Sequence, residues 1–190
     1  MKIQYEIGKN KYDILINNKI ENSISKKINS IKSDKKVLLV YDKKIDQTLV
    51  NKVIKNLKET GCSIITLEFQ GSKKNKNEKS LFSLLNIMID NKFTKKSIVI
   101  SFGGGVLGDL TALAASLYHR GTLYYNIPST MTSIIDSCIG GKTAINYKNI
   151  INSIGNYYHP NTVFIYNEII KLIPEREFIA GIPEILKCGL

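Results

Sequence analysis

Residues 97–109 read SIVISFGGGVLGD, and this stretch decides the fold class. Its first part, residues 97–102, is a short apolar run of the kind that forms a strand buried on both faces of a sheet. A glycine-rich turn follows it, and a helix is expected over residues 107–119. A buried strand that passes through glycines into a helix is typical of α/β proteins that hold a phosphate at the turn.

The turn satisfies the pattern G-x-G-x-x-G with Gly103, Gly105 and Gly108. Glycines let the backbone approach a pyrophosphate, and the helix N-terminus offers unpaired N–H groups. Asp109 is expected in the first helical turn, where a carboxylate favours that terminus. On its own the match is weak, because such a stretch is about as often only a tight turn. It also departs from the usual dinucleotide fingerprint, since residues 126–129 supply no acid for a ribose.

The residues before this stretch alternate between strand-like and helix-like segments. Strands are expected at Lys2–Ile7, 12–16, 36–41 and Ser63–Phe69, and helices at 46–60 and 80–92. The first two strands alternate like a hairpin, and the order of the others predicts a parallel sheet covered by helices. The fold class is therefore α/β, with a Rossmann-like parallel sheet. Residues 71–79 (GSKKNKNEK) are expected to form a mobile surface loop.

A cation on a glycine turn lies downstream of the next expected strand, residues 124–128. The run DSCIGGK ends at Lys142, whose ammonium group suits a phosphate or a carboxylate. Asp136, at the start of the run, offers a counter-charge and an acceptor for a sugar-like hydroxyl. A capping aspartate beside a surface lysine is the simpler alternative, and these residues alone do not exclude it.

The last segment, residues 174–190 (PEREFIAGIPEILKCGL), is expected to be helical, with Pro183 imposing a start or a kink. Glu184 and Lys187 are three residues apart and share a face of this helix. Taken alone, they are best explained as a surface ion pair worth under about 1 kcal/mol.

The chain of 190 residues carries a net charge of +11, and nearly all of its basic residues are scattered lysines, Arg120 and Arg176 being the exceptions. Nucleic-acid sites favour arginine forks and aromatic side chains on one face, so no nucleic-acid partner is expected. No apolar run is long enough for a membrane span or a signal peptide, and no membrane partner is expected. Three cysteines without metal-ligand spacing indicate a reducing, cytoplasmic location.

Together these runs resemble the 3-dehydroquinate synthase family, the shikimate-pathway members of the sugar phosphate cyclases. The matching runs are GGGVLGD at 103–109, YHRG at 118–121, IPST at 127–130, DSCIGGKTAIN at 136–146, NSIG at 152–155 and the segment 174–190. The match is close to colinear, and the combination is highly specific. The first hundred residues resemble the family only in strand–helix order.

The resemblance implies an NAD-binding α/β domain over residues 1–172. It also implies that residues 173–190 begin a helical domain for metal and substrate, most of which is missing. The implied cofactors are NAD and a divalent cation, zinc or cobalt. The implied substrate is a small sugar phosphate, and a homodimer is expected.

The resemblance also implies roles for individual residues. NAD contacts fall on Gly104, Gly105, Val106, Leu107, Gly108, Asp109, Ser129, Thr130, Lys142 and Lys76. Substrate contacts fall on Asp136, Lys142, Asn152 and Lys187. Arg120 corresponds to an arginine that reaches the substrate phosphate of the neighbouring subunit. Glu184 corresponds to one zinc ligand, whereas His119 and His159 match neither of the other two.

The family reaction converts 3-deoxy-arabino-heptulosonate 7-phosphate to 3-dehydroquinate and phosphate, in the biosynthesis of chorismate and the aromatic amino acids. NAD transiently oxidises one hydroxyl, phosphate is eliminated, and the ketone is reduced before the ring opens and closes as an aldol. Zinc acts as a Lewis acid on a bound hydroxyl. A catalytic zinc site needs three protein ligands, and Glu184 is one, so the chain alone is expected to be inactive.

Four positions depart from the family pattern. Ile151 stands where a lysine helps to bind the cofactor, and this loss is expected to weaken NAD binding. Lys73 replaces a cofactor-binding glutamate, Pro183 a common alanine, and Ser129 a threonine whose hydroxyl it keeps.

Three alternatives stay open. The first is another sugar phosphate cyclase, such as 2-deoxy-scyllo-inosose synthase, which would use glucose 6-phosphate. The second is a metal-dependent alcohol or glycerol dehydrogenase, which would produce net NADH. The third is a non-catalytic remnant domain, which would not bind NAD.

Overall fold

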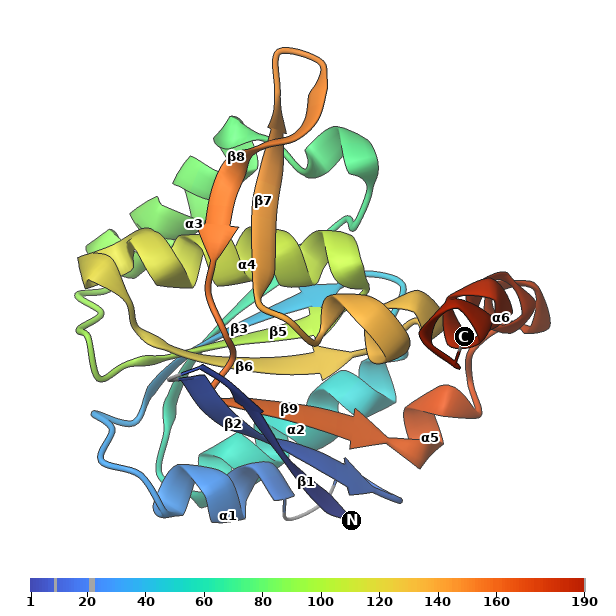
Figure 1. Cartoon of the computed structure of the whole chain (residues 1–190). Coiled ribbons are helices and arrows are strands. Elements are labelled where there is room, and N and C mark those ends of the chain that lie inside the picture. Colours follow the sequence, from blue (N-terminus) through green and yellow to red (C-terminus); the bar gives the residue numbers. More distant parts are fainter. Residues whose placement is uncertain (9, 21–22, 190) are drawn as a thin grey trace.

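A seven-stranded sheet forms the centre of the computed structural model, which describes residues 1–8, 10–20 and 23–189 (Figure 1). The strand order is β1-β2-β9-β6-β5-β3-β4. The bounds are β1 Lys2–Ile7, β2 Asn10–Asn17, β3 Lys36–Asp42, β4 Ser63–Phe69, β5 Ile98–Gly103, β6 Leu123–Pro128 and β9 Thr162–Tyr166. β1 pairs with β2 in antiparallel fashion, and every other pairing in this sheet is parallel.

Helices cover both faces of the sheet, as the α/β prediction requires. They are α1 Ser23–Asn29, α2 Gln47–Glu59, α3 Glu78–Asp90, α4 Gly105–Leu117, α5 Asn167–Ile170 and α6 Glu175–Gly189. Successive strand residues point to opposite faces, so Leu38 packs in one core with residues of α3 and α4. Its neighbour Leu39 packs in the other core with residues of α1 and α2.

A separate β-hairpin, β7 Lys142–Tyr147 and β8 Ile150–Tyr157, stands beside α4 (Figure 1). β7 is anchored by Ile145, which is buried against residues of α3 and α4. All of β8 is exposed. Neither strand was predicted from the sequence, and β8 has no buried face that would impose an alternating apolar pattern.

Several further elements differ from expectation. α1, β9 and α5 were not predicted. The expected loop at residues 71–79 contains a 3₁₀ turn, η1 Lys73–Asn75, and its Lys76 is buried. α6 begins at Glu175 and continues through Pro183, so the proline does not start the helix.

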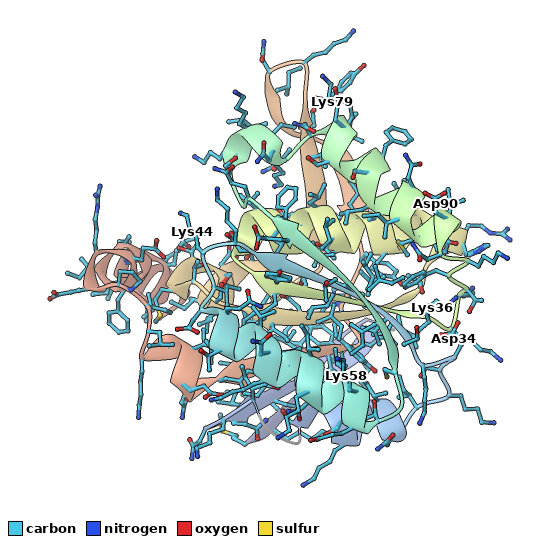
Figure 2. The ribbon with its side chains drawn as sticks, turned by 180° about the vertical axis from the view of Figure 1, so that it is seen from behind. Asp34, Lys36, Lys44, Lys58, Lys79 and Asp90 are labelled. Carbon is cyan, nitrogen blue, oxygen red and sulfur yellow. The ribbon has the colours of Figure 1, made fainter. Side chains whose placement is uncertain are left out.

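The lysines project from many different elements rather than from one face. Figure 2 shows Lys44 after β3, Lys58 near the end of α2 and Lys79 on α3 pointing away from the body of the domain. Among the described residues, no helix is both long and apolar enough to cross a membrane.

Candidate functional site

A cleft of about 520 Å³ opens at the carboxyl edge of the sheet, where ligands bind in open α/β folds. It is lined by residues that follow β3 and β4, by the start of α4, by the residues after β6 and by the segment that leads into α6. These are Asp42, Lys44, Ile45, Asp46, Leu49, Gly71, Gly104, Gly105, Val106, Leu107, Ser129, Thr130, Ile169, Leu172, Ile173, Pro174 and Glu177. Six of the predicted cofactor residues, Gly104 to Leu107 together with Ser129 and Thr130, therefore lie on one cleft.

The start of α4 faces this cleft without a side-chain cap. Gly104 is the N-cap residue and accepts the first intrahelical hydrogen bond, from the N–H of Gly108 at 3.0 Å. The preceding N–H groups of α4 therefore have no intrahelical acceptor. Such a terminus binds anions through these N–H groups and the helix dipole.

A side chain at residue 105 would crowd Ser137, because the start of α4 lies close to the segment that follows β6. A Cβ atom at Gly105 would lie 2.8 Å from Oγ of Ser137, and one at Gly104 would lie 3.2 Å from Cγ2 of Thr130. The glycines thus bring the start of α4 against the segments that follow β6. Their role in the fold is to permit a close approach of these protein segments.

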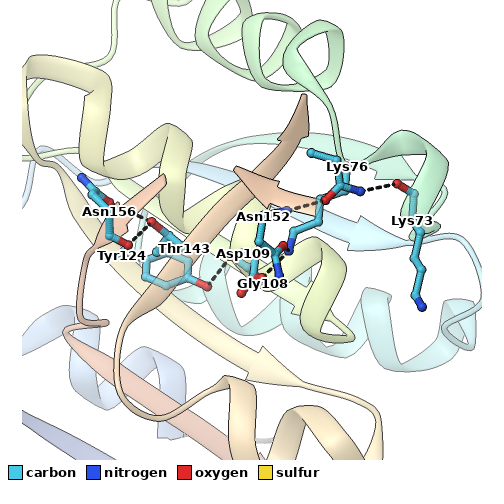
Figure 3. A network of polar contacts seen from close by, with 9 residues as sticks. Lys73, Lys76, Gly108, Asp109, Tyr124, Thr143, Asn152 and Asn156 are labelled. Carbon is cyan, nitrogen blue, oxygen red and sulfur yellow. Dashed lines mark hydrogen bonds and ion pairs between the residues drawn. The ribbon is translucent and has the colours of Figure 1, made fainter. Parts of the chain in front are cut away.

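Asp109 does not lie in the first turn of α4, because the helix begins at Gly105 rather than at residue 107. Its Oδ2 atom instead accepts a hydrogen bond from Nζ of Lys76 at 2.5 Å (Figure 3). The predicted effect of this carboxylate on the helix terminus is therefore wrong. The buried ammonium group attracts it toward η1 and the hairpin.

Lys76 links three segments in a buried ion pair. Its Nζ also donates to Oδ1 of Asn152 at 2.5 Å, and only 7% of its side chain is exposed, against 17% for Asp109. Burial raises the pKa of the Asp109 carboxyl above its usual range, although the hydrogen bond from Lys76 acts in the opposite direction. Lys76 lines neither the cleft nor the polar pocket that lies between α4 and the hairpin.

Hydrogen bonds of Asn146 hold residues 73–76 against the hairpin. The N–H of Asn146 donates to the carbonyl of Lys76 at 2.8 Å, and its side chain donates to the carbonyl of Lys73 at 3.1 Å. The Oδ1 atom of Asn146 accepts the N–H of Asn152 at 2.9 Å. Residues 73–76 and the hairpin therefore form one unit, which fixes the position of Asn152.

A second, polar pocket of about 480 Å³ lies between α4, the turn before β7 and the hairpin. It is lined by Asp109, Asp136, Ser137, Lys142, Thr143, Ala144, Asn152, Ser153, Gly155, Asn156 and Tyr157. Nζ of Lys142 donates to Oδ1 of Asp136 at 3.0 Å, which confirms that the two charges are neighbours. Both are partly exposed, at 56% and 38% of their side chains, so the ammonium group is accessible to an anion.

Besides Lys76 and Gly108, three predicted site residues lie outside both pockets. Arg120 lies at the opposite end of α4 from the cleft, in the turn Tyr118–Arg120. Glu184 and Lys187 lie on α6, where Nζ of Lys187 is 3.3 Å from Oε2 of Glu184. The structure therefore does not bring Arg120, Glu184 or Lys187 to the residues of the polar pocket.

No metal centre is formed within the part of the chain that the structure describes. No group of three or more histidine, cysteine, aspartate and glutamate side chains is placed there to hold an ion. Glu184 supplies one carboxylate, whereas a catalytic zinc needs three protein ligands. These residues alone do not fit the metal that the resemblance implies.

Two polar residues of the site, Asp42 and Asn156, were not predicted. Asp42 ends the buried strand β3 and lies on the cleft, and a polar residue at the carboxyl end of a buried strand was a usable signal. Asn156 lies in the polar pocket, where its Oδ1 atom accepts a hydrogen bond from Oγ1 of Thr143 at 2.7 Å (Figure 3). Thr143 belongs to the polar run that ends at residue 146, whereas Asn156 lies on the unpredicted strand β8, where no expected element pointed to it.

Known proteins match the chain both in sequence and in fold. A family model described as 3-dehydroquinate synthase N-terminal matches residues 66–180. A 3-dehydroquinate synthase of Pelagibacter ubique is 38% identical, with 100% of this chain and 51% of the relative aligned. One of Prochlorococcus marinus subsp. pastoris is 35% identical, with 100% and 53% aligned. The chain spans about half the length of the curated relatives it matches.

Solved structures share the same fold. A 2-deoxy-scyllo-inosose synthase, crystallised with carbaglucose-6-phosphate, NAD⁺ and Co²⁺, matches with a TM-score of 0.88 at 22% identity. The match covers 98% of this chain and 50% of that one. At this identity the likeness supports a Rossmann-like α/β fold.

Proposed function

This chain belongs to the 3-dehydroquinate synthase family, and from that membership we propose that it forms the NAD-binding half of such a synthase. The complete enzyme converts 3-deoxy-arabino-heptulosonate 7-phosphate to 3-dehydroquinate and phosphate. The observation that carries the proposal is a pairing of two sites. An uncapped helix terminus opens on one cleft, and the Asp136–Lys142 ion pair lies in the adjoining polar pocket.

NAD fits the cleft at the carboxyl edge of the sheet. The N–H groups at the start of α4 suit its pyrophosphate, and the hydroxyl of Ser129 adds a donor, whereas the hydroxyl of Thr130 donates to Oγ of Ser133 at 3.0 Å. Asp42 is an acid that the usual fingerprint position lacks, and its carboxylate suits a ribose hydroxyl. When bound, NAD supplies a hydride acceptor for one hydroxyl of the substrate.

The sugar phosphate is assigned to the polar pocket. The Lys142 ammonium group donates to an anionic oxygen, while Asp136 holds that ammonium group and accepts from a hydroxyl. Asn152 presents its amide from the hairpin and is held by Lys76 and Asn146. Lys76 then positions Asn152 and Asp109 rather than contacting NAD directly.

A second polypeptide segment is needed to complete the site. We divide the chain into an NAD-binding domain over residues 1–172 and the start of a helical domain over residues 173–190. Ile179 and Leu186 on α6 are 55% and 59% exposed, which supports a further apolar partner for this helix. The metal ligands beyond Glu184 are assigned to that segment.

The proposal includes a homodimer in which Arg120 serves the neighbouring copy. Three successive residues, His119, Arg120 and Gly121, have positive φ angles of 50°, 61° and 119°. Backbone strain of this kind is found mainly at functional sites. Since Arg120 lies at the far end of α4 from its own cleft, that use is assigned to a second copy.

A charge placed at the helix terminus tests the cofactor cleft. Val106→Glu is expected to weaken NAD binding at least about tenfold, because the new carboxylate repels the pyrophosphate at a distance where charges interact by more than 1 kcal/mol. The measurement is isothermal titration of NAD into the chain. Val106→Gln is the control, because glutamine has nearly the same shape as glutamate but carries no charge. This variant is expected to bind NAD far better than the glutamate variant. Equal affinities for the two variants would refute this placement of NAD.

Removing the pocket's cation tests the substrate site. Lys142→Met is expected to lower the affinity for the heptulosonate phosphate about tenfold or more, because a charged hydrogen bond is worth about 1.5–3 kcal/mol. Lys148→Met is the control, since Lys148 is an exposed lysine in the turn between β7 and β8 and lies outside the pocket. Equal losses in both variants would indicate a general effect of net charge.

A further inference from the structure

The turn that presents Lys142 consists of two glycines in left-handed conformations. Gly140 has φ 89° and Gly141 has φ 72°. A Cβ atom at Gly140 would meet no atom within 4 Å, whereas one at Gly141 would lie 2.8 Å from Nδ1 of His159. It would also lie 3.0 Å from Cε1 and Cγ of that ring. The imidazole ring therefore lies directly against the backbone of Gly141.

Two elements distant in sequence support this turn. The N–H of Tyr158 donates to the carbonyl of Gly141 at 2.7 Å, and the N–H of Gly140 approaches Oη of Tyr12 at 3.4 Å. The rings of Tyr12 and His159 pack with their centroids 5.7 Å apart. The turn is therefore held between β2 and the residues that follow β8.

The imidazole ring meets the turn through van der Waals contact at its Nδ1 edge. That atom is buried and has no hydrogen-bond partner among the described residues, although the ring as a whole is partly exposed. Tyr12 is buried, and burial raises the pKa of its hydroxyl to about 12, so it remains a neutral phenol.

We propose that His159, supported by Tyr12, is a positioning residue for Lys142. Two consecutive glycines give a turn the widest backbone freedom, and Lys142 follows it directly at the start of β7. The ring packed on Gly141 restricts that freedom and holds the ammonium group beside Asp136. This role rests on the proposed function, in which Lys142 binds the anionic group of the substrate.

Removing the ring is the first test. In His159→Ala, the heteronuclear ¹⁵N NOE of Gly140, Gly141 and Lys142 is expected to fall. The dissociation constant for inorganic phosphate is expected to rise about fivefold, because the disordered turn must then become ordered when phosphate binds. The dissociation constant for NAD is expected to stay within about twofold, since the cleft does not include this turn.

His159→Phe retains a ring without nitrogen atoms and is expected to preserve both the NOE values and the phosphate affinity. His119→Ala is the matched control, because His119 packs on Tyr118 away from both pockets. Native NOE values and native phosphate affinity in His159→Ala would overturn the proposal. So would a loss of order at the turn in His159→Phe, or an equal loss of NAD affinity.

The two proposals fail in different ways. If the wild-type chain binds neither phosphate nor the heptulosonate phosphate, the assignment of the polar pocket is wrong. The NOE of residues 140–142 still decides whether His159 orders the turn, because this measurement needs no ligand. Should His159→Ala fail to fold, His159→Phe decides the question, since a disordered turn in a folded His159→Phe protein refutes the role of the ring.

Discussion

Lys76→Met is expected to lower the free energy of unfolding by about 3–5 kcal/mol, the cost of breaking a buried ion pair by removing one partner. The Lys76 ammonium group is within 2.5 Å of both Asp109 and Asn152, and its side chain is 7% exposed. The variant leaves the Asp109 carboxylate, 17% exposed, without its cation. Urea denaturation followed by circular dichroism measures the change.

The double variant Lys76→Met/Asp109→Asn is expected to recover part of this loss, because both charges are removed and no buried charge is left unpaired. Lys142→Met is the control for stability. Its ion pair with Asp136 has a similar N–O distance of 3.0 Å but is exposed, so its loss is expected to cost under about 1 kcal/mol. If the double variant were as unstable as the sum of the single variants, the two residues would not be coupled.

The effect of Lys76→Met depends on pH in a direction set by Asp109. Burial raises the pKa of this carboxyl above 3.8, so the folded chain binds the proton more tightly than the unfolded chain. Such a group contributes stability below its unfolded pKa, and this contribution is lost as pH rises through the folded pKa. Without Lys76 the pKa of the Asp109 carboxyl rises further. The loss in free energy of unfolding caused by Lys76→Met is therefore expected to be largest at neutral pH and to shrink in acid. A loss in free energy of unfolding that does not change with pH would show that the charge of the Asp109 carboxylate does not cause it.

The sheet was predictable because its central strands are buried on both faces. β3 and β5 are continuous apolar runs, a signal that depends on local sequence alone. β9 was missed although residues 162–166 (TVFIY) are an apolar run of the same kind, so the local signal was present and was not used. The start of α4 was placed two residues late, since its glycines were assigned to the turn although packing makes Gly105 helical.

The site residues that lie in one contiguous motif could be predicted from the sequence. The residues that tertiary packing brings to the site could not. The glycine turn and the Asp136–Lys142 pair each lie within one short run of sequence. Lys76, in contrast, lies in a stretch of lysines and asparagines with the composition of an exposed loop. Its burial follows from the hairpin and α4 closing over it, and no local pattern encodes that contact.

The second large effect concerns completion of the enzyme. The purified chain is expected to form no 3-dehydroquinate, because the residues that the structure describes contain no metal centre. A chimera that joins residues 1–189 to the remaining half of the Pelagibacter ubique relative is expected to turn over the heptulosonate phosphate. That relative is 38% identical to this chain and extends well beyond the aligned half. Release of phosphate and formation of 3-dehydroquinate are the measurements, with glucose 6-phosphate and a simple polyol as alternative substrates.

Glu184 decides whether this chain contributes to the completed metal site. In the chimera, Glu184→Gln is expected to reduce kcat/KM at least about 100-fold, because a Lewis acid contributes several kcal/mol to the barrier. Glu175→Gln is the matched control on the same helix, since Glu175 is exposed at the start of α6. Turnover by the chain alone would refute the need for a second segment. An active, metal-loaded Glu184→Gln chimera would refute the role of this carboxylate, and net NADH formation from a polyol would indicate a dehydrogenase instead.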